Sequence, residues 1–203
     1  MSGEVVAKVA GDAVLVADVD GREARLRSSR SAAALPRAGT SEGRQLRRWL
    51  TQLMVTERVV AAEAAAFGLA AAGAPEEREL LPDNVARMEL GSVAASVLQE
   101  PLARALFVRV TAAVDVSNVD VEDYHARNPG RFASVAQRAD GWRSRAPAPL
   151  DEVRPAITEH LRAAARRRAF RRWLDARCAE LVELAPGYEH PGDPRQPDNT
   201  HRH

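Results

Sequence analysis

The chain contains a single cysteine, Cys178, and a single lysine, Lys8, among its 203 residues. A lone cysteine excludes an intramolecular disulfide, and the shortage of cysteine is typical of proteins in a reducing compartment. Aromatic residues make up only 4% of the chain, so alanine and leucine must fill much of the core. Because alanine has the highest helix propensity, this composition predicts a mostly helical protein.

The chain also lacks a strong net charge and a long apolar run. Its formal net charge is +1, so no overall field attracts nucleic acid or an anionic membrane surface. No stretch approaches the roughly 20 apolar residues of a membrane span. The first residues have no charged region followed by an apolar run, which a secretory signal requires. We therefore expect a cytoplasmic protein with neither a nucleic-acid nor a membrane partner.

The motifs of several enzyme classes are absent as well. The sequence has no Gly-x-Ser-x-Gly nucleophile motif, no phosphate-binding loop and no dinucleotide-binding fingerprint. It therefore offers no support for acyl transfer by a serine nucleophile or for binding of a nucleotide through these motifs.

Hydrophobic patterning predicts a small β-hairpin followed by a series of helices. β-Prone runs at 5–9 and 13–16 flank a Gly-Asp turn signal. The clearest helix spans 46–67, where apolar residues recur every three or four positions and Gly68 follows as a C-terminal cap. Further helices are expected at 18–27, 84–99 and 151–183, and another begins at Pro101. Ser117 and Asp120 resemble a capping box, which begins one more helix that ends by Asn128.

Four segments follow one another in an informative order. Residues 6–19 contain the β-prone runs. The segment 46–69 contains the long apolar stripe and finishes with a Gly-Leu pair. Residues 119–132 contain the stretch Tyr-His-Ala-Arg-Asn-Pro-Gly-Arg-Phe, and 150–181 form a long amphipathic segment. The four segments resemble the helical part of SurA- and PpiC-type peptidyl-prolyl isomerases, in which the last two bracket a parvulin domain. Only residues 133–148 lie between them here, whereas a small domain needs about a hundred residues.

The resemblance implies a SurA-like helical cradle without the isomerase domain. The expected fold is mostly α, with a small N-terminal β-hairpin and a long C-terminal helix that packs back on the N-terminal helices. We expect one domain over 1–184, with 133–148 as a short bridge, and an extended, irregular tail over 185–203. In the family this module holds extended apolar segments of client chains and needs no cofactor. The resemblance therefore implies binding of an extended apolar chain in a cleft, without isomerase activity.

The candidate ligand-binding residues are large apolar side chains on the predicted helices and in the bridge: Trp49, Leu53, Phe67, Trp142 and Trp173. Four of them belong to apolar stripes that would serve equally well as plain core. Trp142 lies in the bridge, where it would cover the cradle. The ligand would be an unfolded peptide or a polyketide or acyl chain, and a homodimer is the alternative to a monomer.

The C-terminal tail holds candidates for a metal or acid–base site. His190, Asp193, His201 and His203 are side chains that suit a divalent metal such as zinc, nickel or iron, and the alternative is a solvated tail. The ending also resembles small proteins associated with bacterial polyketide gene clusters. This favours a competing hypothesis, a polyketide isomerase or cyclase. It would act on an acyl chain, free or on an acyl carrier protein, with His190, His201 and His203 as acid–base groups.

Tyr124 and His125 are a second candidate catalytic pair, because two carboxylates precede them and imidazole titrates near neutral pH. Successive helical residues do not share a face, however. The alternative is therefore that Tyr124 packs as an apolar anchor while His125 is solvated. His160 lies between apolar neighbours on the last predicted helix, and we expect it at the surface or at its boundary.

The arginine-rich run at 162–172 is interrupted by apolar residues and flanked by carboxylates. We expect a solvated helix face with ion pairs inside the helix, and we expect Phe170 and Trp173 to face the core. The alternative is a local patch for an acidic partner such as an acyl carrier protein. Cys178 lies on the apolar side of the same helix, and we expect it to be a buried, unreactive thiol.

Overall fold

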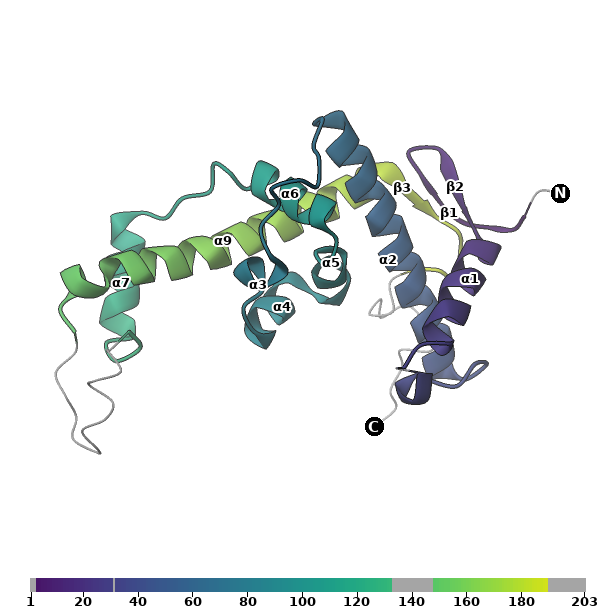
Figure 1. Cartoon of the computed structure of the whole chain (residues 1–203), viewed down its shortest axis with the longest axis horizontal. Helices are drawn as coiled ribbons and strands as arrows, with labels where there is room; N and C mark the ends of the chain where they lie inside the picture. The colour runs from purple at the N-terminus through teal and green to yellow at the C-terminus, as the bar shows by residue number, and fades with distance from the viewer. Residues whose placement is uncertain (1–2, 31, 133–147, 190–203) are drawn as a thin grey trace.

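The computed structural model describes residues 3–30, 32–132 and 148–189. They form a mostly helical protein with a small N-terminal β-hairpin and a long C-terminal helix, which confirms the expected fold class (Figure 1). In these ranges no helix combines the length and apolarity that crossing a membrane requires. The strands are β1 (Val5–Val9), β2 (Asp12–Leu15) and β3 (Val182–Leu184). The helices are α1 (Val16–Arg27), η1 (Ala32–Ala34), α2 (Ser41–Ala66), α3 (Glu77–Leu80), α4 (Asn84–Leu90), α5 (Ser92–Val97), α6 (Pro101–Val110), α7 (Asn118–Arg127) and α9 (Leu150–Leu181).

Strand β1 is the centre of a small antiparallel sheet, with β2 on one side and β3 on the other. The sequence pattern extends the last helix to residue 183, but α9 ends at Leu181 because the next residues form β3. Val182 pairs with Val9 of β1, so main-chain groups that would otherwise form an open sheet edge are paired. Local helix propensity is outweighed here by a pairing between opposite ends of the described chain.

Helix α2 begins several residues before its apolar stripe. The side-chain oxygen of Thr40 accepts a hydrogen bond from the Gly43 backbone N–H at 3.1 Å, which caps the first turn. Gly43 is required at this point, since a Cβ atom would clash with the carbonyl oxygen of Arg37. The helix ends at Ala66, and Gly68 follows with a φ of 63°, as the C-terminal cap predicts.

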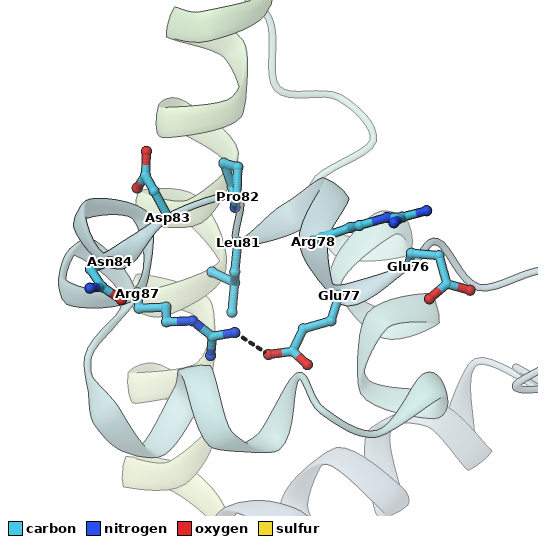
Figure 2. Close-up of a pocket in the computed structure, with 8 residues that line it drawn as sticks. All are labelled: Glu76, Glu77, Arg78, Leu81, Pro82, Asp83, Asn84 and Arg87. Atoms are coloured by element: carbon cyan, nitrogen blue, oxygen red, sulfur yellow. Dashed lines mark hydrogen bonds and ion pairs between the residues drawn. The ribbon is translucent and has the colours of Figure 1, made fainter.

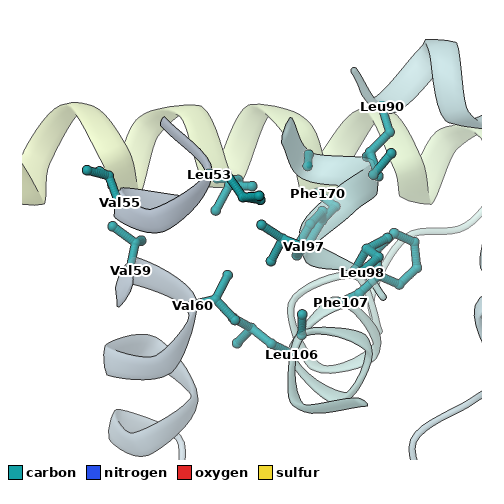
Figure 3. Close-up of a cluster of buried hydrophobic side chains, with 14 of the residues drawn as sticks. Leu53, Val55, Val59, Val60, Leu90, Val97, Leu98, Leu106, Phe107 and Phe170 are labelled. Atoms are coloured by element: carbon teal, nitrogen blue, oxygen red, sulfur yellow. The ribbon is translucent and has the colours of Figure 1, made fainter. Parts of the chain in front are cut away.

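The main hydrophobic core lies where α2, α5, α6 and α9 meet (Figure 3). Phe170 of α9 is fully buried, and its ring centroid lies 5.1 Å from that of Phe107 and 5.8 Å from that of Trp173. Burying a side chain of this size contributes about 2–3 kcal/mol relative to leaving it exposed. Phe170 and Trp173 therefore face the core, as expected.

The helix predicted at 84–99 is divided at Gly91 into α4 and α5. Gly91 has a φ of 89°, in a region that favours glycine because a side chain would be strained there. The break brings Arg171 of α9 against Gly91, where a Cβ atom would lie 3.7 Å from the guanidinium group. The short helix α3 was not predicted, because four residues are too few to show a periodic pattern.

A second, smaller hydrophobic cluster joins α7 to the N-terminal part of α9. Its buried members are Val121, Ala148, Val153 and Ile157. The predicted capping box begins α7, since the Ser117 side chain accepts a hydrogen bond from the Asp120 N–H at 3.1 Å. Figure 1 shows α7 at one end of α9 and the sheet at the other. The long C-terminal helix thus connects two separate packing centres.

Candidate functional site

Two clefts with volumes of about 230 Å³ each border α5. The first, called here the α9 cleft, lies between α2, the α4–α5 junction and α9. Its lining is Gln52, Thr56, Leu90, Gly91, Ser92, Val93, Ala94, Arg171, Leu174, Asp175 and Cys178. Apolar side chains with a small number of polar groups among them are typical of binding sites.

The second cleft, called here the α1 cleft, lies between α1, α2 and the C-terminal end of α5. Its lining is Arg22, Leu26, Trp49, Leu50, Leu53, Glu57, Ser96, Gln99 and Glu100. Arg22 and Glu57 form an ion pair at 2.9 Å that links α1 to α2. Trp49 and Leu53, two of the predicted ligand-binding residues, lie here together because they are one helical turn apart.

Trp49 connects the two clefts. Its indole N–H donates a hydrogen bond to the Ser92 hydroxyl oxygen at 3.2 Å, and Trp49 lines the α1 cleft whereas Ser92 lines the α9 cleft. Gln52 and Leu53 are neighbours on α2 and so point about 100° apart, which directs one side chain to each cleft. The two clefts therefore flank α5 and share a wall at the Trp49–Ser92 contact.

The chain returns to the α9 cleft after β3. The side-chain amide of Gln52 donates a hydrogen bond to the carbonyl oxygen of Tyr188 at 3.0 Å, and the Tyr188 side chain packs against the main core. The candidate residues Trp142, His190, Asp193, His201 and His203 lie outside the described residues. Within residues 3–30, 32–132 and 148–189, no three His, Cys, Asp or Glu side chains are grouped so that they could hold a metal ion.

Cys178 is half-buried in the lining of the α9 cleft. Burial raises the pKa of its thiol, and neighbouring Asp175 acts in the same direction, while a hydrogen bond with Thr56 acts against them. The thiol is therefore protonated at neutral pH, whereas the thiolate is the reactive form. Cys178 contributes a polarizable apolar surface to the cleft rather than a nucleophile.

A wider hollow of about 730 Å³ lies between α3 and α4. Figure 2 shows charged side chains from both helices around it, and Arg87 and Glu77 point toward each other in an ion pair of 2.6 Å. An apolar ligand here would remove water from these charges, which is unfavourable. The hollow is therefore a poor site for an apolar chain.

An aromatic cluster occupies the junction of α7 and α9. The ring centroids of Tyr124, Phe132 and His160 lie 5.5–6.1 Å apart, and the Arg131 guanidinium carbon lies 5.9 Å from the Tyr124 centroid. The Tyr124 hydroxyl oxygen is buried and has no hydrogen-bond partner among the described residues. A buried polar atom without a partner costs about 1–3 kcal/mol, so this hydroxyl is an unusual group in an aromatic cluster.

Tyr124 and His125 point to different surroundings. The His125 Nε2 atom lies 2.9 Å from the carbonyl oxygen of Ala148, so this imidazole ties α7 to the residue two positions before α9. Tyr124 instead packs among the aromatic side chains, as the apolar-anchor alternative expects, whereas His125 is half-buried and held by this contact rather than solvated. The histidine beside Tyr124 is His160, which is half-buried.

The environment of His160 keeps its imidazole neutral. Burial lowers the pKa of His160, and the positive charges of Arg131 and Arg167 lower it further, against the opposing effect of Glu89 and Asp83. Because the ordinary pKa of histidine is about 6.5, the imidazole is largely uncharged at pH 7. It can therefore accept a proton or donate a hydrogen bond, but it is not a permanent cation.

The arginine-rich run of α9 ties this helix to other elements, whereas the sequence predicted a solvated face. Arg167 is buried, and its Nε donates to the Glu89 carboxylate of α4 at 2.8 Å. Arg162 pairs with Asp115, between α6 and α7, at 2.8 Å. The expected pairs inside the helix occur as well, as between Arg162 and Glu159 at 3.2 Å. Partners 47 or more positions away in the chain cannot be read from a helical pattern.

Only part of the predicted ligand-binding set is brought together. Phe67 lies exposed at the far end of α2 from Trp49, with the Arg109 guanidinium 5.2 Å from its ring centroid. Trp173 stacks on Phe170, and neither Phe67 nor Trp173 lines the two clefts. Sequence reasoning missed Ser92, Val93 and Arg171. The signal that could have found the α9 cleft is the glycine inside a predicted helix, Gly91.

Residues 5–42 are similar to a family of unknown function, DUF7158. The matched segment covers the β-hairpin, α1 and η1 and ends in the first turn of α2, and it supplies Arg22 and Leu26 to the α1 cleft. The match covers less than half of the chain. Among curated proteins and among solved structures, nothing matches the chain.

Proposed function

We propose that this chain is a helical binding protein that holds an extended apolar segment of another molecule, without isomerase activity. One observation carries the proposal: two small clefts with apolar side chains in their linings flank α5 and share a wall at the Trp49–Ser92 hydrogen bond. The sequence resemblance to the helical part of SurA- and PpiC-type proteins supports it, since that part holds apolar client segments in the family.

The size of the clefts favours single side chains of an extended ligand. Small-molecule sites typically have volumes of about 300–1,000 Å³, and each cleft is smaller, with about 230 Å³. In an extended chain, alternate side chains point to the same side and lie about 7 Å apart. Two separate clefts therefore suit two side chains of one chain better than they suit one compact ligand.

The polar groups of the clefts suit the main chain of such a ligand. Gln52 and Arg171 lie at the α9 cleft, and Ser96 and Gln99 lie at the α1 cleft. Each carries a side-chain hydrogen-bond donor, and a carbonyl oxygen of a ligand is a suitable acceptor. Main-chain contacts do not depend on ligand sequence, so we expect broad selectivity for apolar segments.

Fluorescence anisotropy with a labelled, unfolded peptide rich in leucine and phenylalanine tests the proposal. Val93→Asp introduces a carboxylate into the α9 cleft, and we expect it to weaken binding by about tenfold or more, because the apolar ligand would remove water from the charge. Val119→Asp makes the same change at an exposed position of α7, and it should leave binding unchanged. Equal affinities for the two variants would place the peptide elsewhere, and no binding by the parent protein would refute the proposal.

The alternative proposal is an isomerase or cyclase that acts on a polyketide or acyl chain, free or on an acyl carrier protein. One observation on the described residues favours it. The Tyr124 ring, whose hydroxyl is buried and has no hydrogen-bond partner among the described residues, packs against the neutral imidazole of His160 with 5.5 Å between the ring centroids, and both side chains can transfer protons. The other candidates for this chemistry are His190, His201 and His203.

Tyr124→Phe separates this alternative from simple binding, because it keeps the ring and removes only the hydroxyl. If Tyr124 transfers a proton, turnover of a polyene thioester, followed by liquid chromatography, should fall by about 100-fold or more. Thermal stability should not fall, since the hydroxyl has no partner to lose. Full activity in Tyr124→Phe that is lost on deletion of 190–203 would assign the chemistry to the tail. No turnover by the parent protein would refute the alternative.

A further inference from the structure

Two strongly exposed apolar side chains lie next to each other on α4. Val85 and Met88 have exposed fractions of 66% and 78%, and their spacing of three positions places them on one side of the helix. The opposite side of α4 is buried through Ala86 and Leu90. The pair is therefore fixed in solvent by the packing of α4 rather than by a mobile loop.

Helix α4 packs against α9, and the residue that follows Met88 on α4 contacts two arginines of α9. The Glu89 carboxylate accepts a hydrogen bond from Arg167 at 2.8 Å, and the Glu89 carbonyl oxygen accepts one from Arg171 at 3.4 Å. Glu89 directly follows Met88 and lies one turn after Val85. The contact that joins the two helices is therefore adjacent to both exposed apolar side chains.

Arg168 and Arg172 extend from α9 into solvent beside this contact. Each follows a residue that contacts Glu89 and so points about 100° further round the helix. Both are exposed, and within the described part of the chain neither forms an ion pair. They lie one turn apart, so their Cβ atoms are about 6 Å from each other. Arg171, by contrast, has Asp175 at 3.8 Å.

We propose that Val85, Met88, Arg168 and Arg172 form a docking surface, the α4–α9 surface, for an acidic amphipathic helix of a partner protein. Apolar side chains of that helix cover Val85 and Met88, and two carboxylates one turn apart pair with the arginines. Charge complementarity selects this occupant, because a basic or wholly apolar partner would leave both cations without a counter-charge. None of the four residues lines the two clefts, so this surface does not depend on the function proposed for them.

Methionine-methyl NMR with two synthetic helical peptides tests the proposal. The peptides share a leucine face, and one carries glutamate where the other carries lysine. We expect the acidic peptide to shift the methyl signal of Met88 but not that of Met54, which packs against the main core. We also expect it to bind about tenfold or more tightly than the lysine peptide, with an affinity that falls as salt rises.

Charge reversal gives the decisive comparison. R168E/R172E should prefer the lysine peptide, whereas R25E/R30E makes the same charge change on exposed arginines near the end of α1 and should keep the original preference. Circular dichroism verifies that both variants are folded. If R168E/R172E does not fold, Met88→Asp replaces it and should abolish binding of the acidic peptide. Equal binding of the two peptides, no Met88 shift, or the same preference in both double variants would overturn the proposal.

Discussion

The two ends of α9 pack in different ways. Its C-terminal half enters the main core, where Phe170 and Leu174 join side chains from α2, α5 and α6. Its N-terminal half meets α7 through a small apolar cluster and a group of aromatic and histidine rings. Regions with few buried apolar contacts open at lower free energy than dense cores. One continuous helix thus joins a stable core to a region that specific polar and aromatic contacts hold in place.

The largest expected losses in free energy of unfolding come from removing one buried side chain from each of the two packing centres. Phe170→Ala removes a fully buried ring and should lower the free energy of unfolding by about 3–5 kcal/mol. Ile157→Ala, in the cluster at α7, should cost about 2–4 kcal/mol and act mainly on that end. Hydrogen exchange should rise throughout α2 and α6 in the first variant and only near α7 in the second. If Ile157→Ala raised exchange in α2 as much as in α7, the two regions would unfold as one unit.

A smaller loss of stability is expected when an arginine of α9 is replaced, and its size should depend on whether that arginine is buried or exposed. The Arg167 side chain is 7% exposed and its partner Glu89 is 31% exposed. Arg167→Ala should therefore cost about 2–3 kcal/mol, because it leaves a partly buried carboxylate without its cation. Arg162→Ala breaks a pair with Asp115, whose side chain is 73% exposed, and should cost much less, because water and salt screen exposed charges. Urea midpoints measure both losses, and equal losses would show that burial does not decide the value of these pairs.

The smallest effect is a pH dependence that originates at the α7 end. Burial and the nearby Arg131 and Arg167 lower the pKa of His160 in the folded protein, so unfolding takes up a proton between that lowered pKa and the ordinary value of about 6.5. The stability linked to neutral His160 is complete above about pH 6.5. It is lost as the pH falls through the lowered pKa.

The parent protein should accordingly lose more stability between pH 7.5 and pH 5 than His160→Gln does. Urea midpoints at the two pH values measure this difference. Carboxylate titrations are common to both proteins and cancel in the comparison. Equal losses would exclude His160 as a source of the pH dependence.

Local signals in the sequence predict much of the fold and part of the candidate site. The capping box at Ser117 and the glycine cap at Gly68 occur where predicted, because both depend on residues within one helical turn. Trp49 and Leu53 reach the same cleft for a similar reason, since residues four apart share a helix face. The sequence does not distinguish them from Trp173, because an apolar stripe has the same pattern whether it lines a cleft or fills a core.

Local sequence signals predict the hairpin and most of the helices in their order, because propensity, periodicity and capping act over a few neighbouring residues. Packing between distant elements, in contrast, sets the pairing of Val182 with Val9, the ion pair of Arg167 with Glu89 and the ring contact of His160 with Tyr124. These contacts join residues 36 to 173 positions apart, as their numbering shows. Their partners are selected by packing of whole elements, which excludes water and makes an unpaired strand edge or charge costly. Both clefts depend on such packing as well, since α1, α2 and α5 form one and α2, α4, α5 and α9 form the other, and these helices meet only when the core closes.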